Sequence, residues 1–113
     1  MKVCDIVHLL DATFLAGEDL GENEVQSACG ADLMSDVLAF VKNKTIMLTG
    51  LTNLQVVRTA EMLDVACIVF VRGKKPSDDI IELANKHGIP ILSTAHTLYT
   101  ACGILYANGI SGS

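Results

Sequence analysis

Residues 44–71, KTIMLTGLTNLQVVRTAEMLDVACIVFV, predict a strand, a helix and a second strand in succession. Residues 45–49 are a short run of strand-forming types that stops at Gly50. Residues 53–64 follow with their apolar side chains on one helical face, at Val56, Val57, Ala60 and Leu63. Residues 66–71 are apolar without alternation, which is typical of a strand buried on both faces. Two such strands joined through an amphipathic helix indicate a parallel sheet covered on both sides.

The sequence after this unit continues the alternation of helix and strand. A helix is expected over residues 77–87, with Ser77 as its N-cap and Gly88 just beyond its end. Residues 89–92 predict a third short strand, and a last helix follows over residues 96–108. The expected fold class is therefore α/β: a three-layer open parallel sheet flanked by helices. Residues 45–49, 66–71 and 89–92 should be parallel neighbours in that sheet.

The first forty residues are less regular. Residues 1–10 have the apolar spacing of a short helix, although a strand is the alternative, and residues 13–16 and 25–29 predict brief strands. Residues 32–41 predict a helix with Leu33, Val37, Leu38 and Val41 on one side. Asp32 at its start is expected to cap the helix rather than to bind a divalent cation. Without any linker, residues 1–113 are expected to form a single compact domain.

Charge and composition exclude several classes of partner. A net charge of −5 without a basic run argues against nucleic acid, which requires a basic face. Half of the residues are hydrophobic, yet no apolar run approaches the roughly 20 residues that span a membrane. We therefore expect a cytoplasmic protein. The four cysteines, which have no CxxC spacing, are interpreted as reduced small hydrophobes: Cys4, Cys29, Cys67 and Cys102.

Polar groups gather in the three loops that follow the predicted strands. The carboxyl ends of parallel strands meet at one edge of a sheet, where such folds bind their ligands. The candidate ligand-binding residues are Thr49, Thr52, Asn53, Arg72, Ser93 and Thr94. Hydroxyls, an amide, a guanidinium and free helix-terminal N–H groups together suit a phosphate or carboxylate. Helix capping is the alternative role for the Thr, Asn and Ser side chains.

A catalytic role has little support in the sequence. The motifs GxxxxGK[ST], GxGxxG and GxSxG are all absent. Only Cys29 and His96 could form a nucleophile and base pair, and only tertiary structure could bring them together. We therefore expect a protein that is not an enzyme and needs no cofactor or metal ion, with a small Cys29/His96 enzyme as the alternative.

Four segments carry a resemblance to a known family: ADLMSDVL at residues 31–38, TGLTN at 49–53, CIVFVRG at 67–73 and GIPILST at 88–94. In this order, and over nearly the whole chain, they resemble the DRTGG domain. That family is similar to the N-terminal domain of bacterial HPr kinase/phosphorylase. It also occurs beside CBS domains in some family II inorganic pyrophosphatases and as small stand-alone proteins. The resemblance implies an α/β fold with a parallel sheet.

The resemblance also limits what can be expected of the function. Residues 22–29, ENEVQSAC, should carry the family's naming motif but lack its Arg and both glycines, so the motif's role is not carried over. The kinase's catalytic domain is missing, so phosphotransfer is not implied either. A stand-alone regulatory or ligand-sensing domain is implied, acting through oligomerisation or on a partner enzyme or kinase. Together with the loops, this favours a phosphorylated small molecule or nucleotide as the ligand. A purely structural assembly module is the alternative.

The last predicted helix carries more apolar side chains than one core can take. Its core stripe, Leu98, Ala101, Cys102 and Leu105, is flanked by Tyr99, Ile104 and Tyr106. One helix cannot bury all of them in its own core and keep a polar outer face. Because tyrosines are enriched in protein interfaces, we expect a homo-oligomer, most simply a two-fold dimer. The alternative is that Phe14 and Leu15 cover this helix within the same chain.

Overall fold

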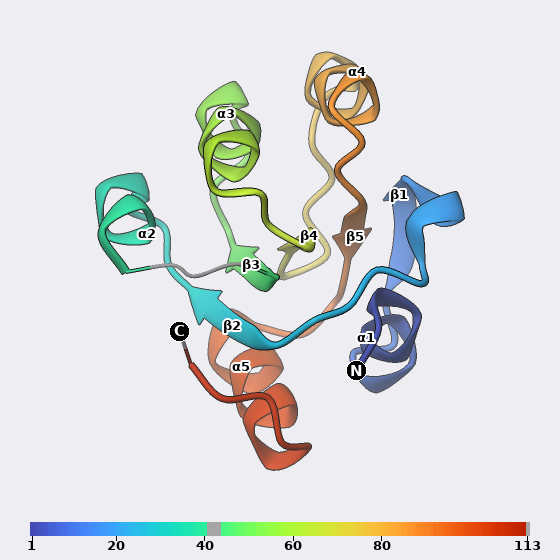
Figure 1. Cartoon of the computed structure of the whole chain (residues 1–113), viewed down its shortest axis with the longest axis vertical. Coiled ribbons are helices and arrows are strands. Elements are labelled where there is room, and N and C mark those ends of the chain that lie inside the picture. The colour runs from blue at the N-terminus through green and yellow to red at the C-terminus, as the bar shows by residue number, and fades with distance from the viewer. Residues whose placement is uncertain (41–43, 113) are drawn as a thin grey trace.

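The computed structural model describes residues 1–40 and 44–112, which form a five-stranded mixed sheet with helices on both faces (Figure 1). In chain order the elements are α1 (Val3–Leu9), β1 (Thr13–Ala16), the 3-10 helix η1 (Glu18–Leu20), β2 (Ser27–Gly30), α2 (Met34–Phe40), β3 (Thr45–Thr49), α3 (Leu54–Leu63), β4 (Cys67–Phe70), α4 (Asp78–Lys86), β5 (Ile91–Ser93) and α5 (Leu98–Ala107). The strand order is β1-β5-β4-β3-β2.

The central strands confirm the prediction made from residues 44–71. β3, β4 and β5 are parallel neighbours, with Ile46 opposite Cys67 and Ile68 opposite Ile91. Every residue of these three strands is buried, because helices cover both faces of the sheet. β2 extends the parallel part at one edge, and β1 pairs antiparallel with β5 at the other. The sheet is therefore mixed, and its antiparallel strand is confined to an edge, as is common in α/β sheets.

The helices divide into two layers. α2, α3 and α4, which connect the four parallel strands, lie on one face, and α1 and α5 lie on the other (Figure 1). α5 contacts both β2 and β3, so the chain passes from β5 to the far part of the sheet. Gly30 permits this close packing, since a Cβ atom there would lie 2.6 Å from Cys102 Sγ. The path of α5 brings its first residue to the carboxyl edge of the sheet.

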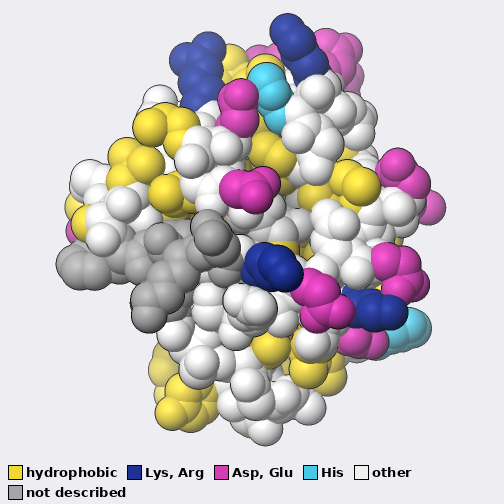
Figure 2. Space-filling model, viewed as in Figure 1, with side chains coloured by type: hydrophobic (Ala, Val, Ile, Leu, Met, Phe, Trp, Pro, Cys, Tyr) yellow, Lys and Arg dark blue, Asp and Glu magenta, His cyan; other side chains and the backbone are white. Residues whose placement is uncertain are grey.

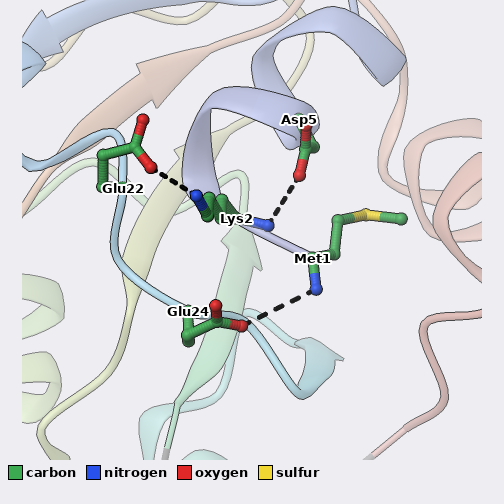
Figure 3. A network of polar contacts seen from close by, with 5 residues as sticks. All are labelled: Met1, Lys2, Asp5, Glu22 and Glu24. Atoms are coloured by element: carbon green, nitrogen blue, oxygen red, sulfur yellow. Dashed lines mark hydrogen bonds and ion pairs between the residues drawn. The ribbon is translucent and has the colours of Figure 1, made fainter.

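The N-terminal segment is fastened to residues 21–25 by backbone and charged contacts. The amides of Val3 and Cys4 donate to the carbonyls of Asn23 and Gly21, at 3.0 and 2.9 Å. Figure 3 shows the charged contacts, in which the Met1 amino group lies 3.8 Å from Glu24 and the Lys2 ammonium pairs with Glu22. The Lys2 amide also donates to Asp5 Oδ2 at 2.8 Å, which ties the start of α1. Residues Val3–Leu9 form α1, so the prediction of a helix rather than a strand in residues 1–10 is confirmed.

Two helices differ from their predictions. In α2, Met34 and Val37 are buried while Leu33 and Leu38 are exposed, and Val41 lies outside the described residues. The predicted stripe was right at Val37 but wrong at Leu33 and Leu38, because Leu33 precedes the helix and α2 lies at the outer end of its layer (Figure 1). α5 begins at Leu98 rather than at residue 96, since the Thr97 side chain accepts a hydrogen bond from the Thr100 amide.

Candidate functional site at the carboxyl edge of the sheet

A small cavity lies at the edge where the parallel strands end. Its volume is about 110 Å³, and it is lined by Asp32, Gly50, Val71, Arg72, Lys74 and Leu98. These residues come from the loops after β2, β3 and β4 and from the first turn of α5. Parallel sheets bind ligands at this edge, so we call this cavity the strand-end pocket.

The carboxylate of Asp32 joins the first two loops of the strand-end pocket. Its Oδ1 accepts a hydrogen bond from Thr49 Oγ1 at 2.9 Å and from the Gly50 amide at 2.8 Å. The expected capping role of Asp32 was wrong: its Oδ1 accepts from Thr49 and Gly50 instead, and the Asp36 and Val37 amides of α2 donate to the backbone carbonyl of Leu33. Lys74 Nζ donates to the Gly50 carbonyl at 2.8 Å, so both the amide and the carbonyl of Gly50 are hydrogen-bonded to side chains.

The basic turn after β4 is held against the segment that leads into α5. The amide of Arg72 donates to the His96 carbonyl at 2.8 Å, and the amide of Gly73 donates to the Thr94 carbonyl at 2.7 Å. Both residues have a positive φ, 61° for Arg72 and 67° for Gly73, which turns the chain sharply after Val71. Ser93 Oγ donates to the Lys74 carbonyl at 3.1 Å. The turn that carries Arg72 and Lys74 is thus fixed by backbone geometry, while their side chains remain exposed.

Of the six residues expected to bind a ligand, Arg72 lines the strand-end pocket and Thr49 contacts it through Asp32. Asn53 caps α3, because its Oδ1 accepts from the Val56 amide at 3.3 Å. The buried hydroxyl of Thr94 donates to the Leu10 carbonyl at 2.7 Å. Thr52 is exposed. Ser93, Thr94 and Asn53 therefore hold the loops in shape.

Sequence reasoning missed Asp32 as a member of the site. The signal that could have found it is its position directly after a predicted strand, residues 25–29, at the same edge as the other three loops. Lys74 was visible in the basic turn, but its bond to Gly50 depends on the neighbouring positions of β3 and β4.

The charges around the strand-end pocket are two cations and one carboxylate. No ion pair with a carboxylate is formed by Arg72 or Lys74 within residues 1–40 and 44–112. The carboxylate of Asp32 occupies the Gly50 amide, which would otherwise be free to bind an anion. An anionic ligand would therefore meet the Arg72 and Lys74 side chains, with the Asp32 charge opposing it.

The alternative Cys29 and His96 pair is not assembled. No hydrogen bond joins the two side chains in the described part of the chain, where Cys29 lies on β2 and His96 follows β5 at the other side of the sheet. Burial raises the pKa of the Cys29 thiol, and the charge of Asp36 raises it further. A nucleophilic cysteine needs the opposite shift, toward the thiolate.

The described residues offer no group of three or more His, Cys, Asp or Glu side chains that could hold a metal ion. Nor does this part of the chain contain a helix that is both long and apolar enough to cross a membrane.

Comparison with known proteins agrees with the fold. The chain is similar to the crystal structure of the CBS and DRTGG domains of the regulatory region of Clostridium perfringens pyrophosphatase, complexed with the activator diadenosine tetraphosphate. The TM-score is 0.76 at 23% sequence identity, and the match covers 92% of this chain and 45% of that one. This chain therefore spans less than half of that neighbour's length. No curated protein matches it in sequence.

The family model of the DRTGG domain matches residues 5–107, which include every strand and all helices but the first residues of α1. The chain belongs to the DRTGG domain family.

Proposed function

We propose that this protein is a non-catalytic regulatory domain that senses a phosphorylated small molecule or nucleotide. The ligand's phosphoryl group would bind at the strand-end pocket, between Arg72 and Lys74. The domain would pass on the signal through self-association or through a partner enzyme such as a kinase. The observation that carries the proposal is a pair of cations beside a cavity, on a turn held by backbone hydrogen bonds, with no carboxylate partner among residues 1–40 and 44–112.

The size of the strand-end pocket limits what can enter it. Its volume of about 110 Å³ corresponds to a few water molecules at about 30 Å³ each. A single phosphoryl group fits such a space, whereas a whole nucleotide does not. The rest of a nucleotide would lie over the exposed loops, near Thr52 and Lys75. A guanidinium can hold two phosphate oxygens at once, which makes Arg72 the principal contact.

The structural neighbour supports a regulatory role. That protein region contains CBS and DRTGG domains and binds diadenosine tetraphosphate as an activator. We extend to this chain only the general role, a response to a nucleotide without catalysis of its own. Diadenosine tetraphosphate is therefore the first probe to test.

The test compares binding to wild type and to two matched arginine variants. Arg72→Ala should weaken binding of diadenosine tetraphosphate and of pyrophosphate by about 10-fold or more, because a hydrogen bond to a charged group contributes about 1.5–3 kcal/mol. Arg58→Ala removes the same charge from the exposed face of α3 and should leave the affinity unchanged. Isothermal titration calorimetry gives the affinities. Equal weakening by both variants, or no binding to wild type, would contradict the pocket.

A purely structural assembly module is the second candidate. It is favoured by the internal hydrogen bonds of Thr49, Ser93 and Thr94, which give these hydroxyls a role without any ligand. This candidate predicts that neither diadenosine tetraphosphate nor pyrophosphate raises the unfolding temperature, since only a ligand that binds the folded state does so. A thermal-shift measurement with both probes separates the two candidates.

A further inference from the structure

The outer face of α5 is apolar and open to solvent. Tyr99 and Tyr106 are 90% and 74% exposed. The N-terminal segment with Phe14 and Leu15 therefore does not cover these two tyrosines, contrary to the alternative expectation. They flank a shallow groove along the helix that also includes Thr100, Gly103, Ile104 and Ala107. Exposed large apolar side chains gathered on one face mark an interaction surface. We call this surface the α5 face.

No residue of α5 carries a charge. In Figure 2 the lower end of the molecule, where α5 lies, shows hydrophobic and uncharged surface without any Lys, Arg, Asp or Glu side chain. The α5 face therefore has nothing to attract an acidic or a basic partner. The whole chain carries a net charge of −5, so two copies repel each other on average over their charged surface. The α5 face is where two copies can approach without that repulsion.

Gly103 lies in the middle of the α5 face without a purpose inside the monomer. A Cβ atom at this position would have no neighbour within 4 Å among the residues that the structure describes, and the backbone is helical. Glycine inside a helix destabilises it relative to alanine, because the unfolded chain has more freedom to lose. The gain that offsets this cost would be the close approach of another backbone, which only glycine allows.

We propose that the α5 face is the interface of a homodimer, in which the α5 helices of two copies cross at Gly103 about a two-fold axis. This deepens the self-association part of the proposed function and does not depend on the strand-end pocket. The pattern suits such symmetry, since Tyr99 lies four residues before Gly103 and Tyr106 three residues after it. An antiparallel crossing thus sets Tyr99 of each copy beside the partner's Tyr106. Each copy then uses the same surface, as a two-fold interface requires.

Sedimentation equilibrium tests the interface with variants that keep the monomer intact. At about 50 µM, where a specific dimer with a micromolar dissociation constant is mostly associated, wild type should be a dimer. Gly103→Leu should weaken dimerisation at least 10-fold by filling the crossing point, although Gly103 is exposed, its new Cβ atom meets open space in the monomer and leucine favours the helix. Tyr106→Glu should do the same by adding a charge to the face.

Met62→Glu is the matched control, because Met62 is 73% exposed on α3, on the opposite side of the sheet. It should leave the dimer intact, and circular dichroism should show unchanged helix content in all three variants. A monomeric wild type, or a Gly103→Leu variant that associates as wild type does, overturns the interface. Calorimetric binding of diadenosine tetraphosphate to the monomeric Gly103→Leu variant separates the two proposals. If the variant binds diadenosine tetraphosphate but wild type is a monomer, only the proposed interface is refuted. If wild type is a dimer but neither protein binds diadenosine tetraphosphate, only the proposed ligand site is refuted.

Discussion

Asp32 offers a test in which stability and ligand affinity should change in opposite directions. Its Oδ1 accepts two hydrogen bonds, from Thr49 Oγ1 at 2.9 Å and from the Gly50 amide at 2.8 Å. Asp32→Ala breaks both bonds. Because Asp32 is exposed and Gly50 is half-buried, water can replace part of what is lost. The free energy of unfolding should therefore fall by about 1–2 kcal/mol, at the lower end of the range for bonds to a charged acceptor.

The same substitution should strengthen the binding of an anion. A phosphoryl group in the strand-end pocket would lie roughly 5 Å from the Asp32 carboxylate that lines it, a separation at which two charges interact appreciably. At an effective dielectric constant of about 40–80 the repulsion of two unit charges at that separation is about 1–2 kcal/mol. Removing it, and freeing the Gly50 amide as a donor, should tighten pyrophosphate binding by about 5–30-fold. Arg72→Ala has the opposite expected effect on affinity.

Asp36→Ala is the matched control, since it removes the same charge from an exposed position four residues later, in the first turn of α2. Urea denaturation gives the stability of each variant, and isothermal titration calorimetry gives the affinity for pyrophosphate. The control should have nearly wild-type values for both. Weaker binding by Asp32→Ala would mean that this carboxylate helps to hold the ligand, and the charge argument for the pocket would be refuted.

Two further predictions concern the scaffold. Gly17→Ala should cost about 2–4 kcal/mol of stability, because φ is +75° and the new Cβ atom would lie 2.8 Å from the backbone Cα of Pro90. Gly88→Ala, with φ +66° and no described residue within 4 Å of its new Cβ atom, should cost only about 1–2 kcal/mol. Equal losses for the two variants in urea denaturation would argue against the close β1–β5 packing. Burial raises the pKa of the Cys67 thiol to about 12, so the unfolded chain, with an ordinary cysteine pKa near 8.5, loses that proton first as the pH rises. The stability that the protonated Cys67 thiol contributes is fully present below about pH 8.5 and is lost toward pH 12. Between pH 7 and 10, wild type should therefore lose about 2 kcal/mol more stability than Cys67→Ala. Equal losses in the two proteins would contradict the raised pKa of Cys67.

The central sheet could be predicted from sequence because its signal is local. The runs at residues 45–49 and 66–71 are apolar on both faces, and each is bounded by a glycine or a polar turn. Burial on both faces selects such runs whatever their neighbours are, so β3 and β4 follow from composition alone. β2 is different: Ser27, Ala28 and Gly30 are small, and the strand gains its place through pairing with β3. Its weak sequence pattern predicted a strand but not which strand it pairs with in the sheet.

The strong local signal of β3 and β4 and the weak signal of β2 explain which residues of the site could be predicted from sequence. Ligands bind beyond the carboxyl ends of parallel strands, and the three strands that are evident from sequence place the turn with Arg72 at that edge. Asp32 follows β2, so its place at the same edge depends on the pairing of Ser27 with Thr45, eighteen residues away. Leu98 reaches the pocket only because α5 crosses beneath β2, where Gly30 leaves room for Cys102.

For the short polar residues after the strands, the sequence cannot tell a structural role from a ligand-binding role. Ser, Thr and Asn after a strand suit both a helix cap and an anion site, since each role asks for the same short polar side chain near free amides. Asn53 took the first role and Thr94 neither, because its hydroxyl reaches the carbonyl of Leu10 in a part of the chain 84 residues away. Arg72 differs from them: its side chain is exposed and forms no hydrogen bond or ion pair within residues 1–40 and 44–112, whereas the neighbouring Lys74 already donates to the Gly50 carbonyl. In an edge crowded with polar groups, the side chains that the fold does not itself require are the ones that point to a ligand.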